Sequence, residues 1–136
     1  MFMTPRLKVA INKNFDKEIC LRFIGREKAG VDFGKNIIKV HPELKGINHM
    51  SLGQQKNLIN VYFDGFYDKR AEEIEKTKER FTKDWEKIQT RFFQACSKYF
   101  DNVPLPQGMY IGFLSIINCN PRFLEDKIFQ VYWKHK

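Results

Sequence analysis

The sequence predicts a single α+β domain, residues 1–136, in which an antiparallel or mixed sheet packs against one long amphipathic helix. Segments of alternating or continuous apolar residues, typical of strands, lie before residue 41 and again after residue 108. Between them, apolar residues recur at helical spacing. A composition of 43% apolar and 29% charged residues is that of a soluble globular protein, and 136 residues are enough for one domain only.

The first third of the chain is expected to form three strands. Apolar and polar side chains alternate over residues 7–12 and again over residues 19–24, so each segment has one face suited to a core. The polar residues 12–18 between them predict a hairpin. The apolar run at residues 37–40 predicts a third strand, which ends before Pro42 because proline restricts the residue that precedes it.

The strongest pattern predicts the long helix. Ser51 and Gln54 have the spacing of a capping box, in which each side chain bonds to the backbone N–H of the other residue. Gly65 is expected to mark a break or kink, because glycine is a poor helix former. The stripe that resumes at Phe66 runs to Asp101, about 54 Å at 1.5 Å per residue. Part of this helix is therefore expected to project, bend or pair with a partner.

Two further strands are expected after the helix, which prolines 104 and 106 bring to an end. Residues 109–117 are apolar on both alternating faces, which is typical of a strand inside a sheet that is covered on both sides. A turn at residues 118–121 and a short connection follow. Residues 127–133 then predict the final strand.

The net charge of +8 raises the question of nucleic-acid binding. Residues 1–65 carry an excess of five positive charges and residues 66–101 an excess of one, so the long helix is not expected to follow phosphates. The candidate contacts for nucleic acid or an acidic partner are Arg22, Arg26, Lys28, Lys35 and Lys39. Aromatic rings between these charges would stack single-stranded bases on a basic sheet face, namely Phe15, Phe23 and Phe33. The alternative is that the charges provide solubility above core phenylalanines.

The sequence predicts neither a zinc site nor a cysteine nucleophile. No catalytic residue, metal ligand or cofactor is predicted. His41, Glu43 and His49 are zinc-ligand types, but they lack the helical i,i+4 spacing that would direct them at one point. The three cysteines fit neither a disulfide framework nor a metal motif, and structural thiols are expected at Cys20, Cys96 and Cys119.

The sequence is expected to be that of a cytoplasmic protein. Structural thiols are typical of a reducing compartment. No run of apolar residues approaches the roughly 20 that a membrane span requires, and the first residues lack a signal-peptide pattern. Contact with a membrane is therefore not expected.

The order of elements in the second half carries a resemblance to a known family. Trp-Glu-Lys-Ile at residues 85–88 and Phe-Phe at 92–93 lie on the long helix. A proline-bounded loop follows, and then three segments, residues 110–114, 119–124 and 129–133. Over roughly residues 50–136 this order resembles the upstream half of small bacterial zincin-type metallopeptidase-like proteins.

The resemblance implies a scaffold without its catalytic centre. In that family a supporting helix and a twisted sheet precede an active-site helix with HExxH, whose histidines hold zinc and whose glutamate activates water. This sequence contains no HExxH. The domain is therefore expected to be incomplete at its C-terminus, or inactive, with a structural or partner-binding role. A zinc metallopeptidase would require an HExxH helix downstream.

The last predicted strand supplies a candidate protein-interaction surface. An unprotected strand at the end of the sheet would expose apolar side chains, which favours a cover that is missing or that a partner supplies. The residues concerned are Phe129, Val131 and Trp133. The expected occupant is a protein partner or a second copy of the chain.

Overall fold

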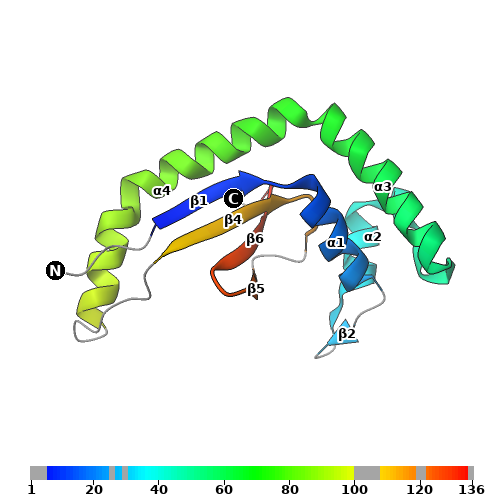
Figure 1. Ribbon diagram of the computed structural model, residues 1–136, viewed down its shortest axis with the longest axis horizontal. Coiled ribbons are helices and arrows are strands. Elements are labelled where there is room, and N and C mark those ends of the chain that lie inside the picture. The colour runs from blue at the N-terminus through cyan, green and yellow to red at the C-terminus, as the bar shows by residue number, and fades with distance from the viewer. Residues whose placement is uncertain (1–5, 25–26, 29–30, 100–107, 119–121, 135–136) are drawn as a thin grey trace.

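A computed structural model describes residues 6–24, 27–28, 31–99, 108–118 and 122–134 (Figure 1). Predictions for Arg26, for Cys119 and for the proline-bounded loop lie outside these residues. Within them no helix combines the length and the apolar character that crossing a membrane requires.

The main sheet joins the start of the chain to its last third. Its strand order is β1 (Arg6–Ile11), β4 (Met109–Ser115), β6 (Ile128–Tyr132) and β5 (Arg122–Glu125). β1 pairs with β4, and β4 with β6, in parallel. β5 runs antiparallel to β6 at one edge, with an irregular register. A separate two-stranded ladder joins β2 (Glu27–Lys28) to β3 (Val31–Asp32).

The fold-class prediction of an antiparallel or mixed sheet against one long helix is wrong. The three principal strands are all parallel, and only the short β5 opposes them. Helices and strands do coexist, but four α-helices occupy most of the described chain. The helices between β1 and β4 explain the parallel direction of that pair, because a long helical connection returns the chain to the end of the sheet where it started. The parallel pair of β4 and β6 is connected through β5 instead.

Helix α1 (Lys13–Phe23) replaces the predicted hairpin and second strand. The Asn12 side chain caps the helix by accepting a hydrogen bond from the Phe15 N–H at 3.0 Å. Phe15 and Ile19 also stand four residues apart, so they share one helical face. The alternation over residues 19–24 is therefore coincidental, and the apolar residues follow the helical period.

Helix α2 (Phe33–Val40) replaces the predicted third strand. Asp32 caps it by accepting a hydrogen bond from the Lys35 N–H at 2.9 Å. Two 3-10 turns follow, η1 (Pro42–Leu44) and η2 (Ile47–His49), and each contributes one fully buried aliphatic side chain to the core.

Helices α3 (Leu52–Lys69) and α4 (Ala71–Tyr99) form the arch above the sheet in Figure 1. The chain bends at Arg70 and not at Gly65, which lies within α3. Hydrogen bonds from Arg70 N–H to the Phe66 carbonyl at 3.0 Å and from Ile74 N–H to the Arg70 carbonyl at 2.9 Å flank the bend. The predicted single stripe is therefore divided between two helices.

The capping box at the start of α3 is confirmed, with Gln54 N–H bonded to Ser51 Oγ and Ser51 N–H to Gln54 Oε1. We expect Ser51→Ala to lower the free energy of unfolding by about 1 kcal/mol, because a helix N–H loses its acceptor. Urea denaturation measures the change. Thr90→Ala, at an exposed position within α4, is the matched control and should leave stability unchanged or slightly raised.

The core lies where α1, α2, the 3-10 turns and α3 meet the carboxyl ends of β4 and β6. Its fully buried side chains come from all of these elements and include Ile19, Cys20, Ile37, Phe63 and Ile116. Burial of Cys20 agrees with the prediction of a structural thiol, whereas Cys96 on α4 is partly exposed. Four polar side chains are buried in the same region, and they are Asp16, His41, Ser115 and Gln130.

Candidate functional site

An apolar groove of about 260 Å³ lies between α4 and one face of the sheet. Helix α4 forms its wall with Phe81, Trp85 and Ile88. The floor comes from β1, β4 and β6 and consists of Leu7, Val9, Gly112, Leu114, Phe129 and Val131. Among the described residues that line it, Asp84 is the only charged one.

Parallel pairing gives the groove its continuous apolar floor. Gly112 is in register with Val9 on one side and Phe129 on the other, and Leu114 is in register with Val131. Residues in register on neighbouring strands point to the same face of a sheet. The floor therefore spans all three parallel strands.

Gly112 makes room for the aromatic ring at the centre of this floor. A Cβ atom at residue 112 would lie 2.7 Å from Cζ of Phe129, closer than carbon atoms approach one another. The ring of Phe129 can therefore lie against the β4 backbone only because residue 112 has no side chain.

The wall of the groove continues along α4 as an exposed aromatic cluster. Ile88 is 43% exposed and Phe92 is 48% exposed. The Trp85 ring meets the rings of Phe92 and Phe93 edge to face, with centroids 5.5 and 5.7 Å apart. Trp85 Nε1 is buried and finds no acceptor among the described residues. This helix thus presents apolar surface that its own sheet covers only in part.

A buried polar cluster lies against the other face of the same strands. The Asp16 carboxylate, 1% exposed on α1, accepts hydrogen bonds from the Tyr67 hydroxyl at 2.7 Å and the Ser115 hydroxyl at 2.5 Å. The backbone N–H of Ile116 donates to it at 3.0 Å, and Nε2 of Gln130 donates at 3.2 Å. One carboxylate therefore ties α1 to α3, β4 and β6.

Burial without a neighbouring cation raises the pKa of the Asp16 carboxyl from 3.8 to about 6. Desolvation is the largest effect, and the four hydrogen bonds oppose it because they favour the ionised form. Burial also raises the pKa of Tyr67 far above its ordinary value, so this residue remains a neutral donor.

His41 bonds to the backbone carbonyl of Ile116, the residue whose N–H donates to Asp16, and is not free to bind a metal. Its Nε2 lies 2.6 Å from the Ile116 carbonyl oxygen, to which it donates, and its Nδ1 lies 2.6 Å from the Tyr62 hydroxyl. Burial lowers the pKa of His41 below 6.5. His49 is exposed, and no three metal-ligating side chains gather anywhere in the part of the chain that the structure describes.

The predicted basic contact residues do not lie on a sheet face. Arg22 lies in the last turn of α1, and Lys35 and Lys39 are exposed on α2, so the prediction of strand positions for Arg22 and Lys39 and of a loop position for Lys35 is wrong. Lys28 is in the short β2. Their binding to nucleic acid or to an acidic partner stays a prediction, which a salt-dependent titration with a single-stranded oligonucleotide measures.

The phenylalanines proposed as a stacking platform are engaged with other rings. Phe15 packs against Phe113 with centroids 5.0 Å apart, and Phe23 against Phe33 at 5.4 Å. All four are partly buried. A platform for bases would need exposed faces, so this arrangement is that of core and boundary side chains.

The predicted interaction surface on the last strand is divided by the fold. Phe129 and Val131 line the apolar groove. Trp133 is only 4% exposed, so its predicted exposure is wrong. Its ring packs edge to face against Phe66 at 5.9 Å, and Lys134 Nζ lies 5.1 Å from the ring centroid. β6 is also an interior strand and not the edge of the sheet.

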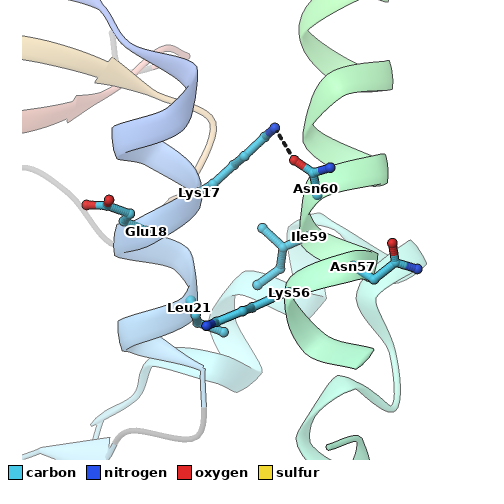
Figure 2. A pocket seen from close by; sticks show the side chains of 7 residues that line it. All are labelled: Lys17, Glu18, Leu21, Lys56, Asn57, Ile59 and Asn60. Atoms are coloured by element: carbon cyan, nitrogen blue, oxygen red, sulfur yellow. Dashed lines mark hydrogen bonds between the residues drawn. The ribbon is translucent and has the colours of Figure 1, made fainter. Parts of the chain in front are cut away.

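A second hollow of about 590 Å³ lies between α1 and α3 (Figure 2). Lys17 reaches across it from α1 and donates to Asn60 Oδ1 at 2.5 Å and to Asp64 Oδ1 at 2.7 Å. Lys13 also pairs with Asp64, at 2.9 Å. Because Lys17 is already held by these partners, the hollow is better explained as the seam between two packed helices than as an anion site.

Comparison with known proteins found no matching family model, no matching curated protein and no matching solved structure. The apolar groove and the buried cluster are therefore the features from which function is inferred. The sequence interpretation missed Asp16, Ser115 and Gln130. The available signal was a polar residue within each of two strands whose neighbours are apolar, because such a residue requires a buried partner.

Proposed function

We propose that this chain forms the upstream, non-catalytic half of a zincin-like, metallopeptidase-like domain, and that its role is to hold an apolar helix in the groove beside α4. The observation that carries the proposal is the open groove itself. Phe129 and Val131 line its floor, and the neighbouring Ile88 and Phe92 of α4 remain about half exposed. Continuous apolar surface of this kind on a soluble domain marks a site of contact.

The order of elements supports a helix as the occupant. The arch of α3 and α4 precedes β4, β5 and β6, as the supporting helix and sheet precede the active-site helix in the family that the sequence resembles. α4 covers only part of the sheet face, and a sheet face that is apolar is normally buried by a second layer of helices. A helix that follows β6 would complete that layer.

The described residues would support a catalytic centre and not supply one. No group of histidine, cysteine or carboxylate side chains among them has a metal-binding arrangement, and both ring nitrogens of His41 are occupied. In this proposal the ligands of a zinc ion come from the added helix. What this chain contributes is the floor and wall that fix the position of that helix.

The reading frame beyond the codon for Lys136 tests the proposal. We expect an HExxH motif within about 20 codons, an interval set by ordinary loop lengths. A protein that includes the motif should hold zinc by elemental analysis and lose it when the first histidine of the motif becomes alanine, with residues 1–136 alone as the zinc-free control. A stop codon without such a motif would contradict the proposal.

A further inference from the structure

Beyond this scaffold role, we propose that Asp16 and Gln130 form a proton-responsive pair that ties helix α1 to the strands of the groove floor. In one state the carboxylate accepts a hydrogen bond from the Gln130 amide. In the other, the protonated carboxyl donates a hydrogen bond to the Gln130 carbonyl oxygen after the carboxamide has turned over.

The first state is the one the structure shows. The four groups around the carboxylate, on Tyr67, Ser115, Ile116 and Gln130, all act as donors. Oδ1 receives Ser115 and Gln130, and Oδ2 receives Tyr67 and the Ile116 N–H. Every donor is therefore directed at an ionised carboxyl group.

The second state has its acceptor already in place. Gln130 is 1% exposed, and its Oε1 is buried without a hydrogen-bond partner among the described residues. A carboxamide carries its donor and acceptor in nearly the same shape, so a half-turn exchanges Nε2 for Oε1 beside Asp16. The proton on Oδ1 would then be donated to Oε1.

Two other donors of the cluster, on Ser115 and Ile116, are less able to reverse. The Ile116 N–H can only donate. Ser115 Oγ already accepts from the Ile117 N–H at 2.9 Å, so its hydroxyl proton continues to point toward Asp16. Gln130 is thus the partner on Oδ1 that can respond to a proton.

The charges around the pair leave the carboxyl free to titrate near neutral pH. Lys13 and Lys17 on α1 turn away from it to pair with Asp64 on α3. Tyr67 faces it from α3 as a neutral donor, whereas His41 bonds to the Ile116 carbonyl, in the peptide group next to the one that donates to Asp16. Burial consequently dominates and raises the Asp16 pKa to about 6.

The pair acts on the strands that carry the groove. Gln130 lies between Phe129 and Val131 on β6, and Ser115 follows Leu114 on β4. Because successive side chains of a strand point to opposite faces, the polar cluster holds these strands from the face opposite the groove. Protonation of Asp16 would therefore change hydrogen bonds to β4 and β6 directly beneath the groove floor.

Nuclear magnetic resonance of the 136-residue chain tests the pair by titration from pH 4.5 to 8. The Asp16 carboxyl carbon and the Gln130 side-chain NH₂ should shift together with a midpoint near pH 6. The amides of Gln54 and Gln55, which bond to α3's cap and to the Ile47 carbonyl, are controls and should stay constant through that midpoint. An Asp16 midpoint near its ordinary value of about 4, or a Gln130 amide that does not follow Asp16, would overturn the proposal.

The Asp16→Asn variant distinguishes a proton on Asp16 from a proton on His41. The variant keeps the shape of the side chain but cannot titrate, so the Gln130 amide should lose its transition near pH 6. If the Gln130 amide still titrates in the variant, the proton resides elsewhere and the pair is refuted. Should the variant not fold, the coincidence of the two midpoints in the unmodified chain remains decisive.

Discussion

Asp16→Ala is expected to lower the free energy of unfolding by about 3–5 kcal/mol at pH 7. The change removes the acceptor of four donors at once, on Tyr67, Ser115, Ile116 and Gln130, and leaves them in a region without solvent. Each buried donor without a partner costs about 1–3 kcal/mol, and relaxation recovers part of the sum. Urea denaturation followed by circular dichroism measures the loss.

The size of this loss should depend on pH in a stated direction. The Asp16 pKa is about 6 in the folded chain and 3.8 ordinarily, so the folded form binds the proton more tightly. The resulting stability is complete below the ordinary pKa and is lost as the pH rises through 6. The penalty of Asp16→Ala should therefore be larger at pH 5 than at pH 7.5, by about 1 kcal/mol. His41 is present in both proteins, and its opposite dependence largely cancels.

Asp68→Ala is the matched control for this prediction. Asp68 is an exposed carboxylate on α3, where a surface substitution changes stability by less than about 0.5 kcal/mol. Equal losses for Asp16→Ala and Asp68→Ala would mean that the buried cluster does not hold α1 to the sheet. If the stability loss of Asp16→Ala does not grow toward pH 5, the raised pKa of Asp16 is contradicted, but the role of the buried cluster is not.

Gly112→Ala should have the second largest effect, a loss of about 1–3 kcal/mol together with closure of the groove. The new Cβ would lie 2.7 Å from the Phe129 ring, which must move away from β4 into the apolar groove. Overpacking of this kind carries that range of cost. The displaced ring also occupies the space that an apolar probe would enter. Denaturation measures the first effect, and fluorescence of a bound naphthalene sulfonate dye measures the second.

The same substitution at Gly65 gives a control with the opposite sign. Gly65 lies within α3, and a Cβ atom there meets no described atom within 4 Å apart from its chain neighbours and the backbone of the same helix. Gly65→Ala should raise stability by up to about 1 kcal/mol and leave dye binding unchanged, because alanine is the better helix former. Strong dye binding by the Gly112→Ala protein would show that the groove is not the apolar site.

Local signals in the sequence were sufficient for some elements. The capping box at Ser51 predicts the start of α3, because all the groups it involves lie within one helical turn. The strands β4 and β6 were predicted from short runs rich in apolar residues. Such runs are typical of strands inside a sheet and are shorter than most helices. β1 was predicted from the alternation of Leu7, Val9 and Ile11, and these positions do share one face.

Helix α1 was missed because its residues satisfy two periods at once. Ile19 and Phe23 are four residues apart, as a helix requires, and they also alternate with polar or small neighbours, as a strand requires. The cap at Asn12 favours the helix, but asparagine is equally typical of the turn that a hairpin needs. The wrong prediction of an antiparallel or mixed sheet followed from this error, since a hairpin forces antiparallel strands.

The burial of Asp16 and its set of partners cannot be predicted from local spacing. Asp16 finds its partners at sequence separations of 51, 99, 100 and 114 residues. Its position four residues after the cap of α1 is that of an ordinary solvent-facing carboxylate. Asp16 is a buried acceptor only because α3, β4 and β6 pack against that side of α1. No sequence pattern within one element predicts this packing.

The pairing of Arg6 with Met109 has a consequence for how the chain is made. At about 5–20 residues per second, a ribosome needs roughly 5–20 s to synthesise the partner of β1 after β1 itself. During that interval the helices between them can form, since their contacts are local, whereas β1 has an unpaired edge. A chaperone that binds extended apolar segments could bind Leu7, Val9 and Ile11 during this interval. Pairing with β4 would then displace the chaperone from these residues.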